Sequence, residues 1–103
     1  MEFELIREKS TLHMIIHIDL NTDNTPLFSL KLKEILDIPE IKLVSLDMSA
    51  IKMVTSQAIG KLLNFYKDMD NRERKLEIKG ISDVLFQQFQ EIHLDRIFPI
   101  YKE

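Results

Sequence analysis

The amino-acid sequence predicts a single α/β domain over residues 1–103, with a mixed, mostly parallel β-sheet, an N-terminal antiparallel hairpin and about three helices. Two observations support this fold class. Short stretches in which apolar and polar residues alternate are followed, in turn, by stretches whose apolar residues recur every three or four positions. The helical stretches are long enough to cross over between parallel neighbouring strands, and 103 residues suit one hydrophobic core.

The composition narrows the classes of function. Hydrophobic residues make up 45% of the chain and charged residues 30%, which fills one core and leaves a solvated surface. The formal net charge of −3 argues against nucleic acid as a partner, because such binders rely on positive charge. The absence of cysteine excludes disulfides, thiolate metal sites and cysteine nucleophiles. Without a long apolar run or a signal-peptide pattern, we expect a cytoplasmic domain that does not bind a membrane.

The chain is expected to open with two paired strands. Apolar and polar residues alternate from Thr11 to Leu20, which predicts a half-buried strand. A shorter alternation begins at Phe3, and the polar residues from Glu8 to Ser10 can turn the chain between the two stretches. We therefore expect an antiparallel hairpin.

A first helix is expected to begin near Pro26, because a proline in the first turn has no intrahelical hydrogen bond to lose. Asp37 and Pro39 are expected to end it. The residues that we expect to face the core are Leu27, Leu30 and Ile35, with Leu32 as an alternative.

A central strand and a long helix are expected next. Ile41 to Met48 is short and rich in residues that favour strands. The following helix has the clearest periodicity in the chain and can be capped by Thr55 or Ser56. Its apolar residues are Ile59, Leu62, Leu63, Tyr66 and Met69. The charged run from Asp68 to Lys75 is interpreted as a solvated helix end followed by a turn.

The last part of the chain predicts one short strand, one helix and an edge strand. Leu76 to Ile78 is the strand, and Gly80 is expected to form a turn after it. Ser82 can cap a third helix, which carries Val84, Leu85, Phe86, Phe89 and Ile92. Ile97 to Tyr101 is the edge strand, broken by Pro99.

Signatures of catalysis and of metal binding are missing. Gly60 and Gly80 are the only glycines, so neither a phosphate-binding loop nor a dinucleotide fingerprint can be assembled. His13 and His17 lie four residues apart on an expected strand, about 13 Å, which is too far to share one ion. His93 is expected at the end of the third helix rather than as a catalytic base. We therefore expect no enzymatic activity, no metal and no cofactor.

The segment after Asp47 differs from the rest of the chain. A partly apolar connection from Ala50 to Val54 leads to two adjacent hydroxyls, Thr55 and Ser56, at the start of an amphipathic helix. A structural interpretation is that one hydroxyl caps the helix and the connection packs beneath it. A functional interpretation is that a surface hydroxyl is presented where free amides and the helix dipole stabilise a phosphate.

The residues of this segment resemble a known family. Leu46 to Leu63, LDMSAIKMVTSQAIGKLL, is similar to the signature of STAS domains of the anti-sigma factor antagonist type, roughly D-L-S-x-V-x-x-I-D-S-S-G-L-G-x-L-L. The ending from His93 to Glu103, HLDRIFPIYKE, resembles the family's usual closing segment. The positions that match the signature in kind and spacing are Asp47, Ser49, Ile51, Val54, Ser56, Ile59, Gly60, Leu62 and Leu63.

The resemblance implies a small STAS-like fold and a phosphorylatable binding module without catalysis of its own. It implies that Ser56 is phosphorylated by a partner serine kinase that is also the anti-sigma factor, with Thr55 as a secondary acceptor. It further implies a PP2C-type phosphatase that acts on the phosphorylated form. The partner-binding residues would be Met53, Thr55, Ser56, Gln57 and Lys61. For Met53, burial in the domain's own core is the alternative.

The sequence departs from the family signature at three positions. Thr55 stands where the family has Asp, Gln57 where it has a second Ser, and Ala58 where it has Gly. Loss of the Asp removes a negative charge and a hydrogen-bond acceptor beside the target hydroxyl. One alternative is therefore a STAS scaffold or sensory domain that does not switch. An alternative from another class is a small enzyme or small-ligand-binding domain with a pocket between the first helix and the sheet.

Overall fold

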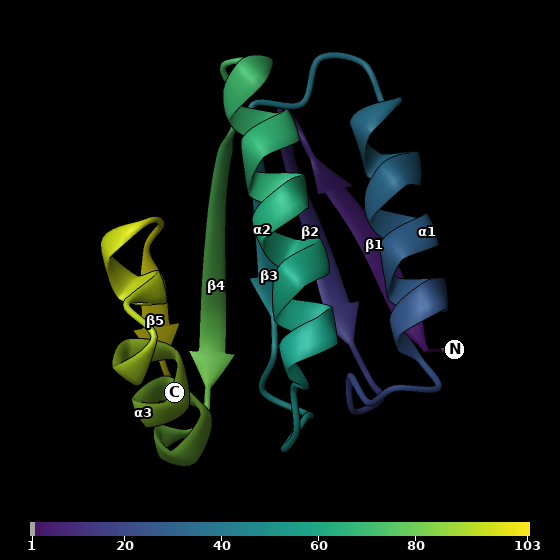
Figure 1. Ribbon diagram of the computed structural model, residues 1–103. Coiled ribbons are helices and arrows are strands. Elements are labelled where there is room, and N and C mark those ends of the chain that lie inside the picture. Colours follow the sequence, from purple (N-terminus) through teal and green to yellow (C-terminus); the bar gives the residue numbers. More distant parts are fainter. Residues whose placement is uncertain (1) are drawn as a thin grey trace.

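The computed structural model describes residues 2–103, so Met1, the first residue of the expected domain, lies outside the described residues. The chain forms one five-stranded sheet in the order β1-β2-β3-β4-β5 (Figure 1). β1 and β2 are antiparallel and all other pairs are parallel, which confirms the predicted mixed sheet with an N-terminal hairpin. The strands are β1 (Phe3–Glu8), β2 (Thr11–Ile16), β3 (Leu43–Asp47), β4 (Lys75–Ile81) and β5 (Ile100–Lys102).

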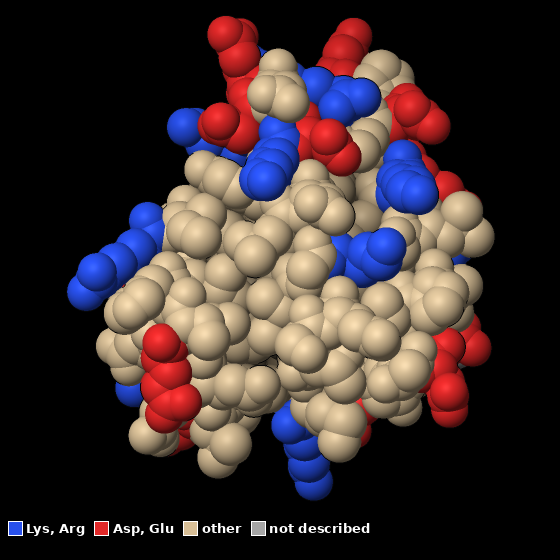
Figure 2. All heavy atoms as spheres, in the orientation of Figure 1, with Lys and Arg blue, Asp and Glu red and all other residues tan. Residues whose placement is uncertain are grey.

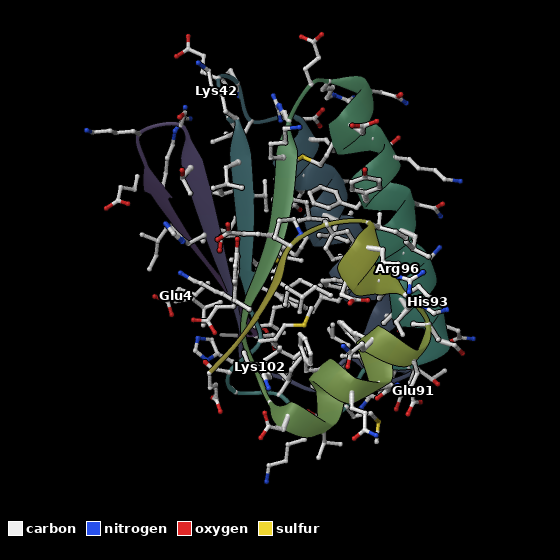
Figure 3. All side chains as sticks on the ribbon, turned by 90° about the vertical axis from the view of Figure 1, so that its left-hand side faces the viewer. Glu4, Lys42, Glu91, His93, Arg96 and Lys102 are labelled. Carbon is white, nitrogen blue, oxygen red and sulfur yellow. The ribbon has the colours of Figure 1, made fainter. Side chains whose placement is uncertain are left out.

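The helices lie on one side of the sheet. They are α1 (Thr25–Leu36), α2 (Ser56–Asn71) and α3 (Asp83–Glu91), followed by the short 3₁₀ helix η1 (Leu94–Arg96). α1 and α2 run side by side across the sheet, and α3 lies near β5 (Figures 1 and 3). Between these layers lies one core, in which Val44, Leu46, Phe28 and Leu62 are fully buried. The core therefore sits between the helices and the central strands.

The buried face of α1 differs from the one predicted. Leu30 is 53% exposed, so its expected place in the core is wrong, while Ile35 and Leu32 are buried as predicted. Phe28, which the prediction left out, is fully buried and stacks on Phe3 of β1 with ring centroids 6.0 Å apart. Phe28 and Leu30 lie about 200° apart around a helix, so burial of Phe28 turns Leu30 toward solvent.

The periodicity predicted for α2 is confirmed. Ile59, Leu62 and Met69 are buried, and Leu63 and Tyr66 flank them as partly buried side chains. Ala58 and Phe65 complete the buried stripe. The helix ends at Asn71, and the charged residues after it turn the chain into β4 as expected.

Gly80 does not form the expected turn but lies inside β4, with φ at +71°. A Cβ atom at this position would lie 3.0 Å from the Cβ of Ser49 and 3.1 Å from Oδ1 of Asp47. The pairing of β4 with β5 shifts register between Ile78 and Ile81. A glycine at this position therefore allows β4 to pass close to the chain that leaves β3, and it does not reverse the chain direction.

The end of the chain follows the predicted order with later boundaries. Ser82 caps α3, because its Oγ accepts a hydrogen bond from the amide of Leu85 at 3.3 Å. The helix buries Leu85 and Phe89, whereas Val84 is 75% exposed and Ile92 is also exposed. The edge strand begins at Ile100 instead of Ile97, since η1 and Pro99 come first.

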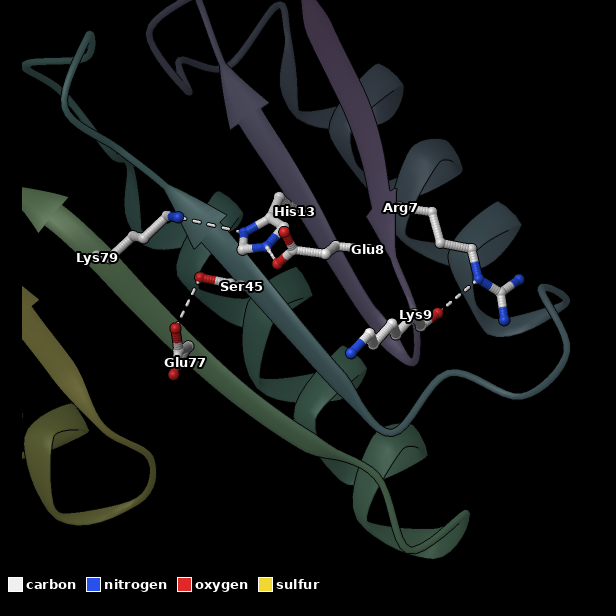
Figure 4. Close-up of polar contacts among 7 residues, drawn as sticks. All are labelled: Arg7, Glu8, Lys9, His13, Ser45, Glu77 and Lys79. Atoms are coloured by element: carbon white, nitrogen blue, oxygen red, sulfur yellow. Dashed lines mark hydrogen bonds and ion pairs between the residues drawn. The ribbon is translucent and has the colours of Figure 1, made fainter.

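The sheet face opposite the helices carries paired polar side chains (Figures 3 and 4). Ser45 Oγ donates to Oε2 of Glu77 at 2.8 Å, and Lys79 Nζ donates to Nδ1 of His13 at 3.2 Å. Nε2 of His13 lies 3.8 Å from Oε1 of Glu8. Side chains of adjacent strands thus satisfy one another, and His13 is a strand residue as predicted.

The two glycines predict opposite effects on stability. A Cβ atom at Gly60, inside α2, meets no atom within 4 Å. We expect Gly60→Ala to raise the free energy of unfolding by about 0.5–1 kcal/mol, because alanine loses less backbone entropy in a helix. We expect Gly80→Ala to lower it by about 1–3 kcal/mol, from the positive φ and the close contacts. Urea unfolding of both variants measures this, and a shift of the same sign in both would contradict the account.

Candidate functional site

The connection between β3 and α2 forms one corner of the molecule. Met48, Ile51 and Val54 are buried and hold the connection against the core, as the apolar pattern predicted. Oδ1 of Asp47 accepts hydrogen bonds from the amide and hydroxyl of Ser49, at 3.0 and 2.7 Å, and so bends the chain just after β3. We call residues 48–55 the site loop.

The site loop pairs with the chain that follows β2. The predicted strand from Thr11 to Leu20 ends at Ile16, but Leu20 returns to form an isolated parallel bridge with Val54. The amide of Leu20 donates to the carbonyl of Met53 at 3.0 Å, and the amide of Thr55 donates to the carbonyl of Leu20 at 2.9 Å. These bonds fix the residue that immediately precedes α2.

Two side chains from elsewhere in the fold hold the same loop. Oδ1 of Asp19 accepts hydrogen bonds from the amides of Lys52 and Met53, at 2.8 and 3.3 Å. Nε2 of Gln88, on α3, donates to the carbonyl of Val54 at 3.3 Å. Sequence reasoning missed both side chains, because each reaches the loop from more than thirty residues away.

Thr55 caps α2. Its backbone is extended, with φ −75° and ψ 163°, and its Oγ1 accepts a hydrogen bond from the amide of Ala58 at 3.3 Å. The prediction left the cap open between Thr55 and Ser56, and the structure assigns it to Thr55. Aspartate and threonine are both good N-caps. Thr55 therefore supplies the acceptor that an aspartate at this position would supply, without its negative charge.

Ser56 is the first residue of α2, and its side chain is exposed. Among residues 2–103 its hydroxyl takes part in no hydrogen bond with another side chain or with the backbone. The amides of Ser56 and Gln57 belong to the first helical turn, where backbone donors have no intrahelical partner. A surface hydroxyl therefore sits beside unpaired donors and the positive end of the helix dipole.

The other residues predicted to contact a partner lie around the same corner. Met53 is 51% exposed, so the alternative that it is buried in the core is wrong. Gln57 and Lys61 are exposed on α2, and Lys61 lies about 7.5 Å along the helix axis from Ser56. Thr55 is partly buried by its capping role. The five residues all fall within residues 53–61, although which of them meet a partner stays a prediction.

The remaining candidates from the sequence form no second site. His17 Nε2 donates to Oε1 of Glu4 at 3.1 Å, and His93 links α3 to η1 with φ at 64°. Within residues 2–103, no three histidine, aspartate or glutamate side chains are grouped so that they could hold a metal ion. No helix in the same range combines the length and apolar character needed to cross a bilayer.

The family model of the STAS domain matches residues 4–103. The chain belongs to the STAS domain family. Among curated proteins, this STAS domain is similar to the anti-sigma-B factor antagonist of Listeria monocytogenes, with 26% identity over 100 residues. The match covers 92% of this STAS domain and 84% of the Listeria protein.

Solved structures share the fold of this STAS domain. A Thermotoga maritima protein described as a candidate anti-sigma factor antagonist superimposes with a TM-score of 0.88 at 18% identity, covering 98% of this chain and 86% of that one. The phosphorylated form of the Bacillus cell fate determinant SpoIIAA gives a TM-score of 0.73 at 13% identity, covering 98% and 92%. At such identities the likeness shows the fold alone.

The capping role of Thr55 can be separated from the exposure of Ser56 by substitution. We expect Thr55→Ala to lower the free energy of unfolding by about 1 kcal/mol, because the amide of Ala58 loses its acceptor. Thr55→Asp should retain stability, since aspartate also caps. Ser56→Ala should change stability by less than about 0.5 kcal/mol, as expected for a surface position. Chemical denaturation of the three variants tests this, and an equal loss in Thr55→Ala and Ser56→Ala would contradict the assignment.

Proposed function

We propose that this STAS domain is a non-catalytic, protein-binding anti-sigma factor antagonist that is switched by phosphorylation of Ser56. The observation that carries the proposal is the exposed Ser56 hydroxyl, on the first residue of a helix whose start is fixed by Thr55 and the site loop. The name of the Listeria relative supports the class of partner, an anti-sigma factor.

In the unphosphorylated form, the partner surface consists of Met53, Thr55, Ser56, Gln57 and Lys61. The site loop is already ordered by Leu20, Asp19 and Gln88, so a partner does not have to order it on binding. Preorganisation of this kind increases affinity, because less conformational entropy is lost in the complex. Met53 supplies a flexible apolar side chain that adapts to the partner.

Phosphorylation requires a kinase as the partner. The Ser56 oxygen attacks the γ-phosphorus of ATP, a new O–P bond forms, the bond to the ADP oxygen breaks, and the hydroxyl proton passes to a base on the kinase. In this proposal the anti-sigma factor is that serine kinase, and a PP2C-type phosphatase hydrolyses the phosphoserine. Thr55 is only the secondary site of phosphorylation, because its hydroxyl oxygen already caps α2.

The phosphate acts on binding rather than on folding. It adds a charge of about −2 at a helix N-terminus, where a negative charge is favoured by about 0.3–1 kcal/mol. In the complex the same phosphate loses water, which costs several kcal/mol unless the partner places Arg or Lys opposite it. Because about 1.4 kcal/mol changes affinity tenfold, we expect binding to weaken by about a hundredfold or more.

Matched Ser56 variants test the switch. We expect Ser56→Ala to bind the partner without regulation and to resist modification, and Ser56→Asp to bind weakly while unfolding at nearly the same temperature as the natural chain. Capture from a lysate of the source organism, followed by calorimetry with the kinase that is recovered, measures both affinities. Mass spectrometry of the protein from its own host locates the phosphate.

Two results would overturn this proposal. Equal affinity of Ser56→Ala and Ser56→Asp for the partner would indicate a STAS scaffold or sensory domain that does not switch. A phosphate found on another residue of the native protein would move the site, with Thr55 the next residue to test. Lys42→Glu is the control, because it changes the charge of an exposed residue that precedes β3, at the other end of this strand from Ser56, and it should bind the partner normally.

A further inference from the structure

A groove runs between α1 and α2 on the outer side of the helix layer. One part has a volume of about 780 Å³ and lies between the first turns of the two helices. A second part, of about 340 Å³, lies farther along the same helices, and both parts are lined by Lys61 and Asn64. We call this continuous hollow the α1–α2 groove.

The floor of the α1–α2 groove is apolar. Gly60 leaves α2 without a side chain at this point, and the space above its backbone is open for at least 4 Å. Pro26 of α1 and the partly buried Leu63 line the same part, and Leu36 lines the other. The groove therefore offers room and apolar surface to side chains from outside.

The walls of the groove carry positive charge, although the chain as a whole has a formal charge of −3. Lys33, Lys61 and Lys67 line it against one carboxylate, that of Asp68. None of the three lysines forms an ion pair with a residue in the range 2–103. Figure 2 shows this face as mostly uncharged, with basic side chains between neutral ones and carboxylates gathered at its upper end and edges.

We infer that the α1–α2 groove binds an acidic, amphipathic helix of a partner protein. Its apolar side chains would fill the space above Gly60, and its carboxylates would meet Lys33, Lys61 and Lys67. The groove follows α1, whose 12 residues span about 18 Å, which matches about three turns of a docked helix. The charge of the lysines selects an acidic occupant over a basic one.

The inference deepens the proposed function, on which it rests for the identity of the surface. Ser56 and Gly60 are four residues apart, so they lie on the same side of α2 about 6 Å apart along its axis. Ser56 does not line the groove itself, but it is adjacent to Gln57, which does, at the N-terminal end of α2. A phosphate there would repel an acidic helix, which gives the switch its direction.

Synthetic peptides test the groove without the native partner or a kinase. The probes are two peptides of about 14 residues, each about 20 Å long as a helix, with leucine on one face and either glutamate or lysine on the other. Titration into the ¹⁵N-labelled chain should give saturable shifts of groove amides with the glutamate peptide and none with the lysine peptide. Raising NaCl from about 0.1 M to about 1 M should weaken binding, because the charges are screened.

Two variants test the groove while the fold is retained: one fills its space and the other reverses the charge of its walls. Gly60→Leu places a side chain in open space and replaces a poor helix former, so it should be at least as stable as the natural chain. We expect Gly60→Leu to weaken binding of the glutamate peptide at least about tenfold, a loss of about 1.4 kcal/mol. The double variant Lys33→Glu, Lys67→Glu should weaken it by the same factor. Lys42→Glu, at an exposed lysine outside the groove, is the matched control and should bind normally.

The inference is overturned if the glutamate peptide does not bind, if the lysine peptide binds equally well, or if Gly60→Leu has no effect on binding. Shifts that depend on protein concentration without peptide would assign the groove to a second copy of the chain and would also overturn it. Failure of the Ser56 switch with the native kinase leaves the peptide result unchanged, so the two proposals fail separately.

Discussion

The corner that presents Ser56 depends on a single stretch of parallel pairing, between Leu20 and Val54. Without it, the end of the site loop that leads into α2 would be held only by the buried Val54 and by the side chains of Asp19 and Gln88. With it, the amide of Thr55 is bonded to the carbonyl of Leu20, so the last residue before α2 has a fixed position relative to the sheet. The start of α2 then has a fixed position as well, and so do the unpaired backbone amides of its first turn.

Two adjacent hydroxyls have different roles because of this constraint. Thr55 is extended, partly buried and bonded to the amide of Ala58, so its oxygen serves the fold. Ser56 is helical and exposed, so its oxygen is available to another molecule. The replacement of the family's aspartate by Thr55 keeps the cap and removes a negative charge beside Ser56. In this proposal, modification occurs at Ser56, the one of the two residues whose change affects the stability of the fold less.

The α1–α2 groove extends the same corner along the helix layer. Gly60 opens the groove where a larger residue would close it, and Lys61 belongs to both the groove and the predicted partner surface. A partner that enters the groove would therefore contact Gln57, the residue next to Ser56. In the proposed mechanism, one added phosphate then acts on a surface much larger than the serine itself.

Periodic patterns in the sequence were enough to predict the order of the elements along the chain and the position of α2, because alternation and helical spacing record burial directly. These patterns were not enough where contacts with residues far away in the sequence determine which side chain is buried or how the backbone runs. Phe28 rather than Leu30 faces the core because Phe3, on another element, stacks on it. Gly80 continues a strand because Ser49 passes close by, and Asp19 binds a loop that the sequence places 33 residues later. The groove depends on how α1 and α2 pack, which no local pattern records.

Amide hydrogen exchange in the unbound protein tests the central claim most directly, namely that the site loop is fixed before any partner binds. The amides of Lys52 and Thr55, bonded to Asp19 and Leu20, should exchange at least about a hundredfold more slowly than those of Ser56 and Gln57, which have no acceptor in the first helical turn. Equal and rapid exchange at all four amides would contradict the account, because the loop would then be ordered only by its partner.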